Sequence, residues 1–313
     1  MARILTITLN PALDLTVRMA RLEVGEVNRS AALLSHAAGK GLNVAQVLSD
    51  LGHQLVVTGF LGQDNLPPFE ALIHQRGFVD GFVRVPGETR SNIKLAEADG
   101  RVTDINGPGP WVDEAAQQTL LDNLEHLASG CEVAVVAGSL PQGIAPQWLQ
   151  TLLLQLEGLG LKVALDTSGA ALRAGLAAGP WLVKPNDEEL ADVYGQPVES
   201  AAARKAAASW LHSLGVEHVV ISQGAAGVSW FSPAAGLQAV PPKVSVASTV
   251  GAGDSLLAGM LHGLISGHGP EQTLATATAI AAMAVTQIGF GVADPVQLAE
   301  LERGVQVRAL TEQ

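Results

Sequence analysis

Residues 248–255, Ser-Thr-Val-Gly-Ala-Gly-Asp-Ser, place two glycines just before an apolar run with helical periodicity. Such a stretch predicts a turn whose backbone N–H groups open onto a helix N-terminus, where free donors and the helix dipole favour an anion. Asp254 follows the second glycine directly. Beside a bound phosphate, its carboxylate is suited to accept a proton from a hydroxyl, as the base in phosphoryl transfer does. The alternative is that Asp254 only caps the helix and interacts with its dipole.

A second glycine-containing turn, Gly39-Lys40-Gly41, precedes Asn43 and a helix expected to run through Leu51. It imitates a Walker A phosphate loop, but no Ser or Thr follows the lysine and the glycine spacing differs. The turn would bring the backbone, one ammonium group and one amide close to a ligand. The alternative is a solvated surface lysine.

Residues 89–97 alternate with the period of two that predicts a strand. On a strand, Arg90, Asn92 and Lys94 share one face, and the residues between them share the other. Two cations and an amide aligned in this way would form a phosphate clamp. The alternative is the solvated polar face of an antiparallel strand.

The composition narrows the class of partner. The chain has 313 residues, 48% hydrophobic and 15% charged, which fits a well-buried globular enzyme rather than a disordered chain. A net charge of −12 argues against binding to nucleic acid or to an anionic membrane surface. The single cysteine, Cys131, suits a reducing compartment, and with no signal-peptide pattern we expect a cytoplasmic protein. The eight histidines include no pair at the helical spacing of metal ligands, so a zinc site is not expected.

Strand-like and helix-like segments alternate along most of the chain. From about residue 133 onward the pattern is strand–helix–strand throughout, which implies a mostly parallel sheet with right-handed crossovers. Polar residues collect just after the predicted strands, at the edge where open α/β sheets bind ligands. A glycine loop at 222–227 also follows a strand. The polar residues at these strand ends are Asp14, Ser139, Lys184 and Ser222.

Two segments depart from this alternation. In residues 13–35, polar and apolar residues alternate weakly and show no helical period. In the second segment, a hairpin is expected around a turn at Asp99-Gly100. Together these segments predict a small four-stranded sheet separate from the main one. From Pro295 the chain predicts a closing helix and a tail, and no linker is long enough for a second independent domain.

Six motifs in this order resemble those of the ribokinase-like sugar kinases, in the phosphofructokinase B branch. They are 8–14 (TLNPALD), 39–43 (GKGLN), 89–92 (TRSN), 138–141 (GSLP), 183–186 (VKPN) with Glu189, and 248–254 (STVGAGD). The resemblance runs over nearly the whole chain. It implies one α/β domain over 1–313, with a doubly wound, mostly parallel central sheet flanked by helices and a β-sheet lid inserted from about 11–36 and 86–108. In this family the lids of two subunits usually clasp, so a homodimer is implied.

The family transfers the γ-phosphoryl of ATP to a sugar hydroxyl with Mg²⁺, and the resemblance implies roles for the matching residues. Asp254 would be the base, and the amides of Gly251, Ala252 and Gly253 would form the anion hole for the moving phosphoryl. Glu189 would help to hold Mg²⁺ through water. The sugar phosphate would contact Asp14, Gly39, Lys40, Asn43, Arg90, Asn92 and Ser139. The nucleotide would lie along Lys184, Asn186, Ser222, Gln223, Gly224, Ala225, Gly227, Thr249, Gly251 and Gly253.

Residues 37–41, Ala-Ala-Gly-Lys-Gly, look like the version of this motif in family members that act on fructose 1-phosphate. Lys40 would put a cation near the 1-phosphate and leave the 6-hydroxyl toward Asp254, which gives fructose 1,6-bisphosphate and ADP. The nearest alternative is a kinase for tagatose 6-phosphate or fructose 6-phosphate, which phosphorylates the other end. An alternative of another class is a sugar-phosphate-binding regulator without turnover. Its signature would be a lost base or a broken anion hole, and both motifs are intact in the sequence.

Overall fold

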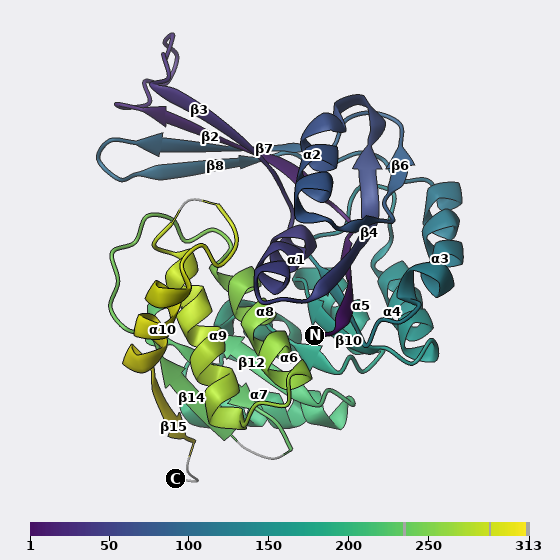
Figure 1. The fold of residues 1–313 in the computed structure, drawn as a ribbon, viewed down its shortest axis with the longest axis vertical. Coiled ribbons are helices and arrows are strands. Elements are labelled where there is room, and N and C mark those ends of the chain that lie inside the picture. The colour runs from purple at the N-terminus through teal and green to yellow at the C-terminus, as the bar shows by residue number, and fades with distance from the viewer. Residues whose placement is uncertain (234–235, 288, 311–313) are drawn as a thin grey trace.

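Two sheets of different size organise the chain in a computed structural model that describes residues 1–233, 236–287 and 289–310 (Figure 1). The larger sheet is built around parallel strands in the order β12-β11-β10-β9-β1-β4. Their buried aliphatic residues run nearly without a break, as expected for a sheet covered on both faces. The bounds are β1 (Arg3–Thr8), β4 (Gln54–Gly62), β9 (Val133–Ala137), β10 (Lys162–Asp166), β11 (Leu182–Val183) and β12 (His218–Ser222), with β5 (Val79–Asp80) and β6 (Val83–Val85) beyond β4.

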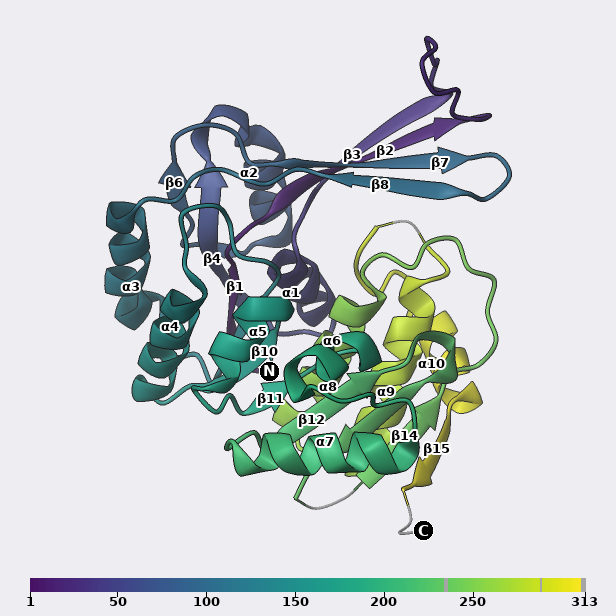
Figure 2. The ribbon, with the colours of Figure 1, turned by 180° about the vertical axis from the view of Figure 1, so that it is seen from behind.

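Helices cover both faces of the large sheet, and the apolar residues beneath them form two separate cores. Leu152 and Leu211 belong to one core, and Leu48 and Leu257 belong to the other. Figure 2 looks onto α3 (Glu114–Ala128), α4 (Pro146–Gly158), α5 (Gly169–Leu176), α6 (Asp187–Tyr194) and α7 (Ala201–Ser213). Figure 1 looks onto α1 (Lys40–Asp50), α2 (Pro67–Arg76), α8 (Ala252–Ile265), α9 (Pro270–Ala284) and α10 (Pro295–Gly304). The doubly wound, mostly parallel α/β fold is confirmed.

The winding of the sheet reverses at β1. From β1 the chain first adds β4 on one side, and it later adds β9, β10, β11 and β12 in succession on the other side. The carboxyl ends of β1 and β9 therefore flank the point of reversal, where open α/β sheets form their ligand crevice. The residues that follow these strands meet there, because Nδ2 of Asn10 donates a hydrogen bond of 3.1 Å to Oγ of Ser139.

The small sheet has the order β3-β2-β7-β8 and stands away from the core, above the loops that precede α8 and α10 (Figure 1). The separate sheet expected from the sequence is confirmed. The pairing register places Asp14, Asn92 and Lys94 on one face, and mostly apolar side chains on the other. The strands are β2 (Ala12–Met19), β3 (Ala32–Ala38), β7 (Ser91–Glu97) and β8 (Val102–Asn106).

Two expectations from the sequence need correction. The strand–helix–strand pattern ends at β12, after which β13 (Val228–Phe231) and β14 (Gly236–Val240) continue the sheet antiparallel. The connections between these strands are too short for the crossover that a parallel neighbour requires. The tail expected after the closing helix contains β15 (Gln306–Ala309), which pairs with β14 at the sheet edge, while residues 311–313 lie outside the described residues.

Within the described residues, no helix combines the length and the hydrophobicity needed to cross a lipid bilayer.

Candidate active site

The turn before α8 presents backbone donors at a helix start. Gly251 is the N-cap residue and has a φ of 79°, in the left-handed region that favours glycine. A Cβ atom at this position would also lie 2.5 Å from the ring of Phe290, so packing requires glycine as well. The first N–H groups of a helix have no partner within the helix, and they therefore face whatever binds at its end. We call residues 251–254 the anion-binding turn, after the role that the sequence predicts for them.

Asp254 lies in the first turn of α8 and is 6% exposed. Nδ2 of Asn43, on α1, donates a hydrogen bond of 2.7 Å to Oδ2 of Asp254. Burial, and next the carboxylate of Asp166, raise the pKa of Asp254 to about 6, against the opposing effects of Lys40, Asn43 and Lys184. Such a carboxylate is a stronger base than an ordinary one and is still mostly ionised at pH 7. In the part of the chain that the structure describes, no side chain forms a capping hydrogen bond at the start of α8, so a capping role for Asp254 is not supported. Its position in the first turn still allows the favourable interaction with the helix dipole.

Asp166 is a site residue that the sequence patterns did not single out. It ends β10, and its side chain is 1% exposed. Nζ of Lys40 donates a hydrogen bond of 3.3 Å to its Oδ1, and Nζ of Lys184 forms an ion pair of 3.3 Å with its Oδ2. The position of Asp166 at the carboxyl end of a predicted strand was the one signal that could have found it.

Lys184 approaches the anion-binding turn closely. A Cβ atom at Gly253 would lie 3.2 Å from Nζ of Lys184, so glycine leaves room for the ammonium group beside the turn. Lys184 itself is 5% exposed and follows β11 directly. The second lysine, Lys40, begins α1 immediately after Gly39, which is the N-cap residue of that helix. Two helix starts and two ammonium groups thus converge on one place.

Asn186 and Glu189 form a capping box at the start of α6. The Glu189 N–H donates to Oδ1 of Asn186 at 2.8 Å, and the Asn186 N–H donates to Oε2 of Glu189 at 2.9 Å. Both residues also line the same cavity as Asp254. The capping box fixes the orientation of the Glu189 carboxylate and engages one of its two oxygens.

The central cavity, at the carboxyl edge of the large sheet, brings together most of the predicted sugar, metal and catalytic residues. Asp166 and Val250 line it as well. The predicted residues in its wall are Asp14, Gly39, Lys40, Asn43, Arg90, Asn92, Lys184, Asn186, Glu189, Ser222, Gly251, Gly253 and Asp254.

The apolar cavity, of about 540 Å³, lies on the other side of the same turn. Thr249 and Ala252 face this cavity, whereas Gly251 and Gly253 face the central one. Its walls are largely aliphatic, which suits a flat aromatic base. Sequence reasoning missed the wall formed by α9, because small buried residues on an apolar helix look like ordinary core. Gly224, Ala225 and Gly227 line it as predicted nucleotide residues, together with Val246, Thr278, Ala281, Ala282 and Val285.

Two predicted site residues are not brought to these cavities. Ser139 is exposed, and its hydroxyl accepts the hydrogen bond from Asn10. The side-chain amide of Gln223 donates to Oγ of Ser229 at 2.8 Å, and it lines neither cavity.

Arg90 precedes β7 rather than lying on it, so it is not part of the strand face that the alternation predicted. Its guanidinium donates to the carbonyl oxygens of Asn10, Pro11 and Gly107 at 3.0–3.4 Å. These bonds hold together the segments that connect the small sheet to the core. Burial lowers the pKa of Arg90, and the nearby carboxylate of Asp14 opposes this effect.

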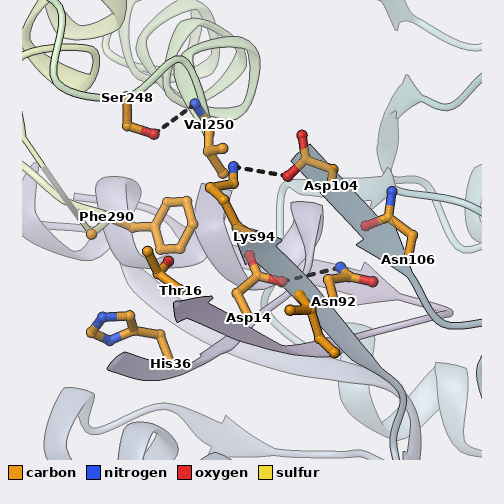
Figure 3. Close-up of a pocket in the computed structure, with 12 residues that line it drawn as sticks. Asp14, Thr16, His36, Asn92, Lys94, Asp104, Asn106, Ser248, Val250 and Phe290 are labelled. Carbon is orange, nitrogen blue, oxygen red and sulfur yellow. Dashed lines mark hydrogen bonds and ion pairs between the residues drawn. The ribbon is translucent and has the colours of Figure 1, made fainter. Parts of the chain in front are cut away.

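A third cavity, the small-sheet cavity, lies between the small sheet and the loops before α8 and after α9 (Figure 3). Nδ2 of Asn92 donates a hydrogen bond of 3.0 Å to Oδ1 of Asp14, and Lys94 forms an ion pair of 3.4 Å with Asp104. Burial raises the pKa of Asp14, although Asn92, Lys94, Arg90 and His36 oppose this effect. Figure 3 shows Phe290 and Val250 facing these polar groups from the core side.

Comparisons with known proteins agree with this geometry. Residues 7–296 match the family described as pfkB family carbohydrate kinase. The chain is 48% identical to the 1-phosphofructokinase of Vibrio cholerae, over 98% of this chain and 97% of the relative. It is 43% identical to the 1-phosphofructokinase of Escherichia coli K12, over 98% of both chains. A crystal structure of Escherichia coli phosphofructokinase-2 with fructose-6-phosphate superposes with a TM-score of 0.87 at 26% identity, over 97% of this chain and 99% of that one.

Proposed function

The chain belongs to the pfkB family of carbohydrate kinases, and we propose that it transfers the γ-phosphoryl of ATP to the 6-hydroxyl of fructose 1-phosphate, giving fructose 1,6-bisphosphate and ADP. The observation that carries the proposal is the grouping of Asp254, the anion-binding turn and two lysines in one cavity. Phosphoryl transfer requires mainly positioning and charge stabilisation, and these groups supply both. The choice of sugar is supported by the relatives named 1-phosphofructokinase.

Asp254 accepts the proton of the attacking hydroxyl in this mechanism. Asn43 engages Oδ2 of Asp254, which leaves the other oxygen for the substrate. The N–H groups of Gly251, Ala252 and Gly253 receive the oxygens of the phosphoryl group in transit. Lys184 stands beside this turn and offsets the negative charge that collects there.

The sugar phosphate lies between the small sheet and α1. Asp14 and Asn92, already joined to each other, contact sugar hydroxyls, and Gly39 allows close backbone approach. Arg90 donates to three carbonyls, and a guanidinium carries five N–H donors, so it keeps donors for the 1-phosphate. The sequence pointed to Lys40 for this phosphate. Because Lys40 is paired with Asp166, we assign it to the reacting end of the substrate instead.

ATP lies along the turn with its base in the apolar cavity, against Gly224, Ala225, Gly227 and Thr249. Among the described residues, no cluster of three or more potential ligands can hold a metal. Mg²⁺ fits the site nonetheless, because it usually keeps several waters and is bound by one or two carboxylates plus substrate phosphates. Glu189, fixed by its capping box in the cavity wall, would hold it through water. When bound there, Mg²⁺ would neutralise part of the negative charge of the phosphates.

The apolar face of the small sheet supports a homodimer as the functional form. Leu33 and Ile105 are 62% and 53% exposed on this face. The register places Leu15, Val17, Ile93 and Leu95 beside them, which makes a continuous apolar surface that a second copy would cover. We also propose that the small sheet acts as a lid within one α/β domain, and that the protein is cytoplasmic, as its single cysteine suggests.

The test is an ADP-release assay with ATP and Mg²⁺ on fructose 1-phosphate, fructose 6-phosphate and tagatose 6-phosphate in parallel. We expect strong preference for fructose 1-phosphate. Preference for a 6-phosphate would reverse the orientation of the sugar while leaving Asp254 as the base. Calorimetric binding of nucleotide and sugar phosphate without any bisphosphate formed would support the non-catalytic regulator instead.

A further inference from the structure

Asp166 is a buried anion whose two oxygens serve two different cations. Its side chain is 1% exposed, and a carboxylate removed from water in this way requires compensation. Lys40 contacts Oδ1 and Lys184 contacts Oδ2, each at 3.3 Å. The two lysines come from α1 and from the end of β11, which lie on different parts of the large sheet. One carboxylate therefore fixes the relative position of two ammonium groups that the chain does not otherwise connect.

The carboxylate is itself rigidly placed. Asp166 is the last residue of β10, and its carbonyl oxygen accepts the N–H of Gly138 at 2.9 Å, beside the reversal point of the sheet. A lysine side chain that is not held loses considerable rotamer freedom on binding an anion. Lysines already held by a fixed carboxylate do not have to reorganise when charge develops on a phosphoryl group.

Both lysines face the place where the phosphoryl group is transferred. Lys184 stands against Gly253 in the anion-binding turn. Lys40 lines the central cavity together with Asp254 and Glu189. On this basis, and resting on the proposed function, we propose that Asp166 is a positioning residue that holds Lys40 and Lys184 on either side of the transferred phosphoryl group and does not itself contact the substrate.

The variant Asp166→Asn tests this role, because it keeps the shape of the side chain and removes its charge. We expect kcat to fall by about 10²-fold with much smaller changes in both KM values, since the lysines act on charge that develops during transfer. Asp80→Asn is the matched control. It removes the ion-pair partner of Arg84, and neither residue lines any of the three cavities, so it should lower stability without changing kcat.

The pH profile separates positioning from a loss of stability. Asp166 raises the pKa of Asp254, whereas Lys40, Asn43 and Lys184 lower it. Removal of the Asp166 charge should therefore shift the acid limb of kcat/KM to lower pH, and Asp80→Asn should not shift it. An unchanged kcat, an unchanged acid limb, or full recovery of Asp166→Asn at raised Mg²⁺ concentration would overturn the proposal, the last because it would make Asp166 a metal ligand.

A chemical measurement keeps the test independent of turnover. Burial lowers the pKa of Lys40, but the carboxylates of Asp166, Asp254 and Glu189 raise it, and the net result is a pKa above the ordinary value. In Asp166→Asn, reductive methylation of Lys40 followed by mass spectrometry should be several-fold faster, while labelling of Lys162 should stay unchanged. Equal labelling of Lys40 in both proteins would refute the positioning role. A wild-type protein without sugar-phosphate turnover would refute the proposed function and leave this comparison valid.

Discussion

Asn43 and Asp254, which are 211 positions apart in the chain, are joined by a hydrogen bond of 2.7 Å between α1 and α8. Each of these helices begins at a glycine, Gly39 in one case and Gly251 in the other. The hydrogen bond therefore fixes the candidate base relative to both helix starts.

Asp254→Asn should lower kcat by roughly 10²-fold or more, because the amide cannot accept the hydroxyl proton. The melting temperature should not fall. Burial of the Asp254 charge raises its pKa to about 6, so the ionised side chain costs stability at neutral pH. Kinetics and thermal unfolding of the same preparation check both statements. Near-normal kcat combined with a lower melting temperature would instead identify Asp254 as a structural residue.

The acid limb of kcat/KM should report the ionisation of Asp254, with activity falling below about pH 6 as the carboxylate is protonated. The hydrogen bond from Asn43 lowers the pKa of Asp254 and stabilises the ionised form. Asn43→Ala should therefore move the acid limb to higher pH, opposite in sign to the shift expected for Asp166→Asn. Measurements of kcat/KM between pH 5 and 8 on the wild type and both variants would test these shifts. If the acid limb of both variants stays at the pH of the wild type, a group other than Asp254 is responsible for it.

The stability of the fold should depend on a histidine cluster that the sequence spacing did not reveal. Nε2 of His53 lies 2.9 Å from Nδ1 of His262, and the rings of His262 and His268 stand edge to face. Burial first, and then His53 and His268, lower the pKa of His262 to about 4. The unfolded chain binds the proton near pH 6.5, so this contribution is complete above pH 6.5 and is lost as the pH falls toward 4.

Urea unfolding at several pH values checks this contribution. The free energy of unfolding of the wild type should decrease more steeply than that of His262→Gln between pH 6.5 and 4. The difference between the two proteins is the informative quantity, since other groups such as Asp254 titrate in both. Parallel pH dependence would show that His262 does not contribute.

Ile105→Asp should convert the proposed dimer to a monomer, because it places a charge in the apolar face of the small sheet. Val102→Asp is the matched control. Val102 is 50% exposed on the same strand, but the register puts it on the opposite face, with Ala96 and Lys94. Light scattering at working concentration would give the mass of each protein. A monomeric wild type would refute the dimer, and equal dissociation by both variants would refute the choice of face.

The sequence by itself determined the parts of the site that are local in the chain. The two glycines and Asp254 fall within residues 251–254, so their spacing alone specifies a helix start with a carboxylate beside it. The buried strands likewise specified the sheet and the edge at which the polar residues gather. The reason is that backbone conformation and hydrophobic periodicity depend on neighbouring residues.

The tertiary structure decided which side chains meet. Lys40 appeared from its motif to be free for a sugar phosphate, but its partner Asp166 lies 126 residues away on β10. Ser139 and Gln223 occupy motif positions, yet each is engaged with a neighbour outside the cavities. An ion pair or a hydrogen bond depends on which strand ends and helix starts are brought within about 3 Å, and only the packing of the whole sheet fixes those distances.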